Sequence, residues 1–99
     1  MFARIVTSQV KVSHLATAVS TWQKSASEDL KPMSGFKSSY LNVDRTSGKW
    51  VVVSFWDTEA DAKAVSSSGT YQKILEAFED CFEEGTPKNL EILEVLAQV

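Results

Sequence analysis

The sequence is poor in the residues that build disulfides and metal centres. It contains one cysteine, Cys81, and one histidine, His14, among 99 residues. A single cysteine cannot form an intrachain disulfide, and one cysteine with one histidine supplies too few ligands for a structural zinc site. We therefore expect no metal site, and we expect Cys81 to be a buried, inert thiol.

The sequence also lacks an excess of positive charge and a long apolar run. Ten basic and thirteen acidic residues give a net charge of −3, whereas nucleic-acid binders usually carry a basic patch because phosphate contacts dominate their affinity. No apolar run approaches the ~18 residues that span a bilayer, and the opening Met-Phe-Ala-Arg does not have the pattern of a signal peptide. These absences predict a cytoplasmic protein with no nucleic-acid or membrane partner.

The composition that remains is that of an ordinary globular domain. Hydrophobic residues make up 43% of the chain and charged residues 23%, both close to average values for globular proteins. A chain of this length corresponds to one domain, which we expect to span residues 1–99. Composition carries no chemical information, so any function has to come from pattern and resemblance.

Four segments rich in β-branched and aromatic residues predict strands. They cover residues 2–12, 36–43, 50–56 and 90–99. Asp44 to Gly48 connects the second and third strands as a hairpin loop, in which Gly48 is free to take a positive φ. The third strand is apolar on both faces, which predicts that both of its faces are covered.

Two segments with apolar residues three and four positions apart predict helices. The first begins at Ser13, whose hydroxyl is expected to cap it, and ends before Pro32. The second begins at Thr58, which is also a predicted cap. It is interrupted by Ser-Ser-Ser-Gly at 66–69, resumes from Thr70 with an apolar stripe that reaches Phe82, and is expected to end at Gly85-Thr86-Pro87.

The resulting order, β-α-β-β-α-β, predicts a ferredoxin-like α+β fold with an antiparallel sheet and both helices on one face. The third and last strands place apolar side chains on the opposite face as well. An exposed apolar sheet face marks an interface, and a two-fold homodimer with the sheets face to face covers it. We therefore expect a homodimer through the sheet face, the dimeric α+β barrel.

Four short segments share their pattern with a known family. They are the opening strand 2–7, the turn 32–36, the loop 44–49, and 55–62, where a strand ending in tryptophan precedes a capped helix with spaced alanines. Together with Tyr71 they resemble the antibiotic biosynthesis monooxygenase-like family of the dimeric α+β barrel superfamily, over nearly the whole chain. The resemblance implies a homodimer with a pocket in each subunit between sheet and helices. Some members oxygenate polycyclic aromatic substrates with O2 and without metal or flavin, and others cleave haem.

The resemblance disfavours haem cleavage. The haem-cleaving branch has an asparagine on the first strand, a tryptophan on the second helix and a histidine ligand further on. The corresponding positions here hold Ser8, Val65 and about Leu75. We therefore expect no cofactor.

The quinone-forming oxygenases resemble this chain at Trp56. Some of them carry an asparagine four residues before that tryptophan and a tyrosine six residues after it. Here these positions are Val52 and Ala62. One of the three residues is thus matched, and we assign no catalytic residue, because no histidine or carboxylate clearly projects towards a pocket.

Five residues are candidates for contact with a ligand. They are Ser8, Trp22, Trp56, Tyr71 and Phe78. Trp56 can stack on a planar ligand or serve as a core residue at a strand end. Trp22 and Phe78 lie on helix stripes that face the sheet, as core or as pocket lining. Ser8 is polar on an apolar strand, which a pocket explains, and the Tyr71 hydroxyl can orient a ligand or bond a loop carbonyl.

Two classes of function fit this pattern, and whether the protein is an enzyme stays open. The first is a cofactor-independent monooxygenase with a small apolar pocket for an aromatic or quinol-type substrate, which the protein orients and helps to convert to the carbanion that reacts with O2. The alternative is a non-catalytic homodimer, which either binds a small molecule or has its pocket filled by Trp22, Trp56 and Phe78. A pocket of at least about 300 Å³ favours a ligand over a filled pocket.

Overall fold

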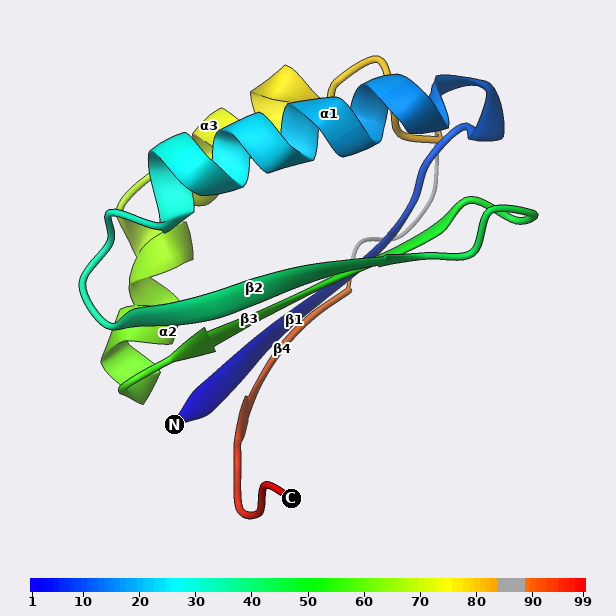
Figure 1. Ribbon diagram of the computed structural model, residues 1–99. Helices are drawn as coiled ribbons and strands as arrows, with labels where there is room; N and C mark the ends of the chain where they lie inside the picture. The colour runs from blue at the N-terminus through cyan, green and yellow to red at the C-terminus, as the bar shows by residue number, and fades with distance from the viewer. Residues whose placement is uncertain (84–88) are drawn as a thin grey trace.

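The fold is built on an antiparallel sheet. Its strands are β1 (Phe2–Gln9), β2 (Phe36–Val43), β3 (Lys49–Trp56) and β4 (Asn89–Glu94), in the spatial order β2-β3-β1-β4. The computed structural model describes residues 1–83 and 89–99. In Figure 1 the helices lie together on one side of the sheet. The predicted ferredoxin-like α+β fold is confirmed.

Five helical segments connect and cover the strands. They are η1 (Val12–His14), α1 (Leu15–Ser25), the π-helical turn η2 (Ala26–Leu30), α2 (Glu59–Ser67) and α3 (Thr70–Ala77). In the described part of the chain, no helix is long and apolar enough to cross a membrane. The predicted interruption is confirmed but is shorter than 66–69: α2 continues to Ser67, and Gly69, with a φ of 85°, separates α2 from α3.

One of the two predicted helix caps is confirmed and the other is wrong. The Thr58 hydroxyl accepts a hydrogen bond from the backbone N–H of Asp61, at 3.1 Å, and so caps α2. Ser13 does not cap α1. The chain first makes the 3-10 turn η1, α1 begins at Leu15, and its capping residue has no side-chain cap hydrogen bond. The Ser13 hydroxyl lies instead 3.1 Å from Nδ1 of His14.

Three predicted element ends are too late, each for a reason of pairing or geometry. β1 ends at Gln9, opposite Lys49, because β3 begins there; the expected end was residue 12. β4 ends at Glu94 rather than 99, because its partner β1 begins at Phe2, directly opposite. The last helix ends at Ala77, well before the predicted stop at residues 85–87, which lie outside the described residues, and Phe82 forms a β-bridge with Val10.

The register places alternate residues of β1 towards the helices. Arg4, Val6 and Ser8 lie opposite Ser54, Val52 and Trp50 of β3. Side chains that pair across an antiparallel ladder share one face. The buried core on this side is assembled from strands and helices together, and it includes Trp50, Trp56, Val65, Phe78 and Cys81. Cys81 is buried, as predicted.

The opposite side of the sheet carries no helix in the described part of the chain (Figure 1). We call it the outer sheet face; register and alternation place there an apolar group, Ile5, Tyr40, Val51, Val53, Phe55 and Leu93, together with polar residues that include Thr7 and Glu91. Tyr40 and Leu93 are 59% and 53% exposed. Asn42 also lies on this face, where its side-chain N–H donates to the Val51 carbonyl at 3.3 Å.

Candidate functional site

A cavity of about 40 Å³ lies between the sheet and the helices, and it is the candidate site. Apolar and aromatic side chains dominate its lining. Every element except β2, β4 and η1 contributes. The lining residues are Arg4, Val6, Ser8, Trp22, Ser25, Ala26, Leu30, Trp50, Val52, Val65, Tyr71, Ile74, Leu75, Phe78 and Phe82.

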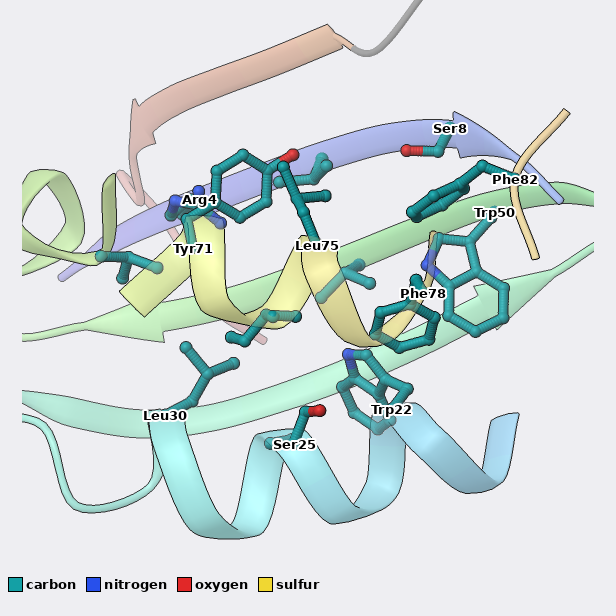
Figure 2. A pocket seen from close by; sticks show the side chains of 15 residues that line it. Arg4, Ser8, Trp22, Ser25, Leu30, Trp50, Tyr71, Leu75, Phe78 and Phe82 are labelled. Carbon is teal, nitrogen blue, oxygen red and sulfur yellow. The ribbon is translucent and has the colours of Figure 1, made fainter. Parts of the chain in front are cut away.

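The two ends of the cavity differ in chemistry. Figure 2 shows Trp50, Phe78 and Phe82 gathered at one end and Arg4 beside Tyr71 at the other. The Trp50 and Phe78 rings meet edge-on with centroids 5.7 Å apart, and Phe78 and Phe82 are also 5.7 Å apart. One end therefore suits an apolar ring, and the other end suits a polar group.

The cavity is small for a ligand site. Its 40 Å³ is far below the roughly 300 Å³ typical of a small-molecule pocket, although it exceeds the ~10–15 Å³ that one water occupies on a comparable measure. Side chains thus fill most of the space between helices and sheet. Several lining residues are only half-buried, among them the long side chains of Trp22, Tyr71 and Leu75, and movement of these side chains can enlarge the cavity.

Arg4 is the unexpected member of the lining. It sits in β1, between two other strands of the sheet, and is only 4% exposed. Its Nη2 donates to the Ser66 hydroxyl at 3.2 Å, and its guanidinium carbon lies 4.5 Å from the centre of the Tyr71 ring. Within residues 1–83 and 89–99, its Nε has no hydrogen-bond partner and no ion pair includes Arg4. Burial lowers the pKa of this guanidinium, and Tyr71 acts in the opposite direction.

Four of the five candidate residues line this one cavity. Ser8 and Phe78 are buried, and Trp22 and Tyr71 are half-buried at its edge. Trp56 does not line it. Its side chain is fully buried, its ring meets Phe36 edge-on at 5.5 Å, and its Nε1 donates to the Ser54 hydroxyl at 2.9 Å.

Sequence reasoning missed Arg4, although a signal for it was present. Arg4 stands four residues before Ser8 on an otherwise apolar strand, and strand residues separated by an even number share a face. Any argument that turns Ser8 towards the helices therefore turns Arg4 there too. A charged residue on the buried face of a central strand is rare unless it is paired, so Arg4 was a candidate functional residue.

The remaining lining offers little for acid–base or metal chemistry. Arg4 and Tyr71 are its titratable side chains, and the described lining includes no carboxylate and no imidazole. Among the described residues, no group of three or more His, Cys, Asp or Glu side chains is placed to hold a metal ion. The chemistry that this cavity supports is therefore binding, orientation and electrostatic stabilisation of a ligand.

Ionisation of Tyr71 is expected to lower the free energy of unfolding at alkaline pH. Burial raises the pKa of its phenol, and Arg4 partly offsets this. An acid whose pKa is higher in the folded state ionises first in the unfolded chain, so stability is full below about pH 10 and falls as the pH rises further. We expect Tyr71→Phe to lose less stability than the wild type over that rise. Urea denaturation of the wild type and of Tyr71→Phe across this range measures it; equal slopes for the two proteins contradict the prediction.

Comparison with known proteins bears on the fold and the family. Residues 1–81 match the model of the antibiotic biosynthesis monooxygenase family. A search of curated protein sequences gives no match.

Solved structures give the same result for the fold. SnoaB from Streptomyces nogalater, named as a cofactor-independent oxygenase, superimposes with a TM-score of 0.74 at 11% identity, over 99% of this chain and 95% of that one. A protein from Caulobacter crescentus CB15, named as a candidate antibiotic biosynthesis monooxygenase, gives 0.78 at 13% identity, over 97% and 90%. One from Nitrosomonas europaea, named likewise, gives 0.76 at 17% identity, over 96% and 89%. At such identities the likeness concerns the fold alone.

Proposed function

The chain belongs to the antibiotic biosynthesis monooxygenase family, and on that premise we propose that it is a cofactor-independent monooxygenase-like protein whose cavity takes a small aromatic or quinol-type substrate. The observation that carries this proposal is the lining, in which aromatic and aliphatic side chains surround one buried guanidinium. The name of SnoaB, a cofactor-independent oxygenase of the same fold, supports it. We propose that the functional unit is a single domain over residues 1–99, and the pairing of β4 with β1 beyond the family match supports this.

The proposed reaction needs no external reductant. Oxidation of an activated ring methylene to a carbonyl consumes one O2, places one oxygen atom in the carbonyl and releases the other in water. The substrate reacts as its carbanion, in which the electrons left by the departing proton attack O2. The protein orients the ring and keeps water away from the reactive carbon, and the aromatic end of the cavity supplies flat apolar surface for that purpose.

Substrate entry requires the cavity to widen. Trp22 on α1 and Leu75 on α3 point into it from opposite helices (Figure 2), and both are half-buried. Rotation of these side chains towards solvent enlarges the space without breaking the sheet. The ligand then takes the place of protein side chains rather than of a preformed void.

A second function has its own supporting observation. The 40 Å³ volume fits a homodimer whose pocket is filled by its own side chains and which binds nothing. The two proposals share the fold and the dimer, and they differ in whether the cavity opens for a ligand. That difference is directly measurable.

The test combines ligand stabilisation with oxygen uptake. We expect anaerobic anthrone, which carries the ring methylene, at 100 times its Kd to stabilise the protein by about 2.7 kcal/mol, and aerobic mixtures to consume O2 faster than the autoxidation background. Leu75→Trp fills the cavity and should abolish both effects. Gln72→Trp, on the exposed side of the same helix, should preserve them. No stabilisation by any compound of this class, with uptake at background, favours the filled homodimer.

We also propose that the protein is a homodimer joined through the outer sheet face. That face combines half-buried Val51, Val53 and Phe55 with exposed Tyr40 and Leu93, and exposed apolar patches of this kind mark interfaces. Leu93→Glu is expected to shift the sedimentation mass from dimer to monomer at micromolar concentration, because it buries an unpaired charge in the dimer. Val12→Glu, equally exposed but off the sheet, should leave the dimer intact. Two variants with the wild-type mass contradict this interface.

A further inference from the structure

The charge of Arg4 is not balanced within the described protein. The side chain is 4% exposed, and its nearest polar partners are one neutral hydroxyl, that of Ser66, and the face of the Tyr71 ring. Guanidinium stays protonated in proteins, and a buried charge without a counter-ion carries a large desolvation cost. The cation–π contact recovers only part of that cost.

The unbalanced charge faces the cavity. Arg4 is one of its lining residues, and the Tyr71 ring lies against the guanidinium at the same end (Figure 2). Every other lining side chain is uncharged. A molecule that enters with its ring among Trp50, Phe78 and Leu75 therefore meets positive charge at one end only.

We propose that Arg4 forms an anion subsite at this end of the cavity and that the ligand it selects is an aromatic phenol in its ionised form. Ser66 and Tyr71 are positioning residues, which hold the guanidinium in place from α2 and α3. The inference rests on the proposed function, since it concerns the same cavity, and it adds the charge of the ligand.

The subsite provides what the lining otherwise lacks. With no carboxylate or imidazole to take a proton, the phenol itself has to be ionised, its proton passing to solvent as it binds. A fixed positive charge in a water-poor cavity favours the phenolate over the phenol, and it acts without reorganisation because the protein already holds it there. An ionised phenol in turn enriches the ring in electrons for reaction with O2.

The experiment compares two probes that differ by the ionisable group. Para-nitrophenol, whose phenolate is coloured and which titrates near neutral pH, is set against nitrobenzene, of nearly the same shape. We expect the wild type to bind the phenolate about tenfold more tightly than nitrobenzene, as a charged hydrogen bond provides. The colour of the bound probe should also appear at lower pH than in buffer. Arg4→Met should bring the affinity ratio close to one while changing nitrobenzene affinity by less than about twofold.

A second variant tests the subsite without replacing a buried residue, in case Arg4→Met does not fold. Ser66 is exposed, so Ser66→Ala leaves the core intact, and it should lower the phenolate preference about two- to threefold through a less well-held guanidinium. Equal binding of both probes, unchanged in Arg4→Met and Ser66→Ala, overturns the anion subsite and leaves the proposed ligand cavity standing. Failure of both probes to bind the wild type overturns the cavity and the subsite together.

Discussion

Replacement of Trp56 by alanine is expected to lower the free energy of unfolding by about 3–5 kcal/mol, the range for a fully buried large aromatic. The side chain is 0% exposed, packs edge-on against Phe36 at 5.5 Å, and hydrogen-bonds Ser54 at 2.9 Å. The cavity left behind lies in the buried core beside Phe36 and Ser54. Urea denaturation monitored by circular dichroism measures the loss.

The conservative variant separates packing from ligand contact. Trp56→Phe keeps a ring in place but removes the Nε1–H donor from the buried Ser54 hydroxyl, at an expected cost of about 1–2 kcal/mol. Because Trp56 does not line the cavity, this variant should bind nitrobenzene as the wild type does. Trp22→Phe, which does alter the lining, should weaken that binding. If Trp56→Phe weakens it as much as Trp22→Phe, Trp56 is a ligand residue and its place in the core is a secondary role.

Trp56 and Arg4 mark the limit of inference from the sequence. A tryptophan at the end of an apolar strand has the same local pattern whether it lines a pocket or fills the core. What decides between them is the neighbour across the sheet, here Phe36, which approaches through the β-bulge between Phe36 and Ser38. No spacing along the chain encodes that bulge. The position of Arg4, in contrast, could have been predicted, because alternation along β1 places it on the same face as Ser8.

The order of elements was predictable because each depends on local signals. Alternating or continuous apolar runs mark strands, three-and-four spacing marks helices, and the Thr58 cap is a contact within four residues. Element ends were less predictable, because they depend on partners. β4 stops at Glu94 only because Phe2, its partner, begins β1. The cavity volume is harder still to predict from the sequence, because it is the small difference between the space inside the fold and the volume of the side chains that fill it.

Arg4→Met is expected to make the ligand-free protein more stable, by about 1–3 kcal/mol. Methionine has an unbranched side chain that can occupy the buried space of Arg4 without a charge. Apolar replacement of buried ionic groups is often stabilising by about 1–4 kcal/mol. That range is a net effect, in which the contacts of the replaced group, here the cation–π contact with Tyr71 and the hydrogen bond to Ser66, are already lost. Ser66 is exposed, so its hydroxyl turns to water. Urea denaturation near neutral pH gives the difference.

The matched control is an exposed arginine. Arg45→Met in the β2–β3 hairpin removes the same charge from a solvated site and should change stability by less than about 0.5 kcal/mol. A loss of stability of more than about 1 kcal/mol in Arg4→Met would mean that the guanidinium is paired in solution, which removes the reason to place a ligand anion beside it. A gain in stability accompanied by a loss of phenolate preference has one physical cause. The charge that selects the ligand is then the same charge that destabilises the ligand-free protein, and binding of the anion offsets that destabilisation.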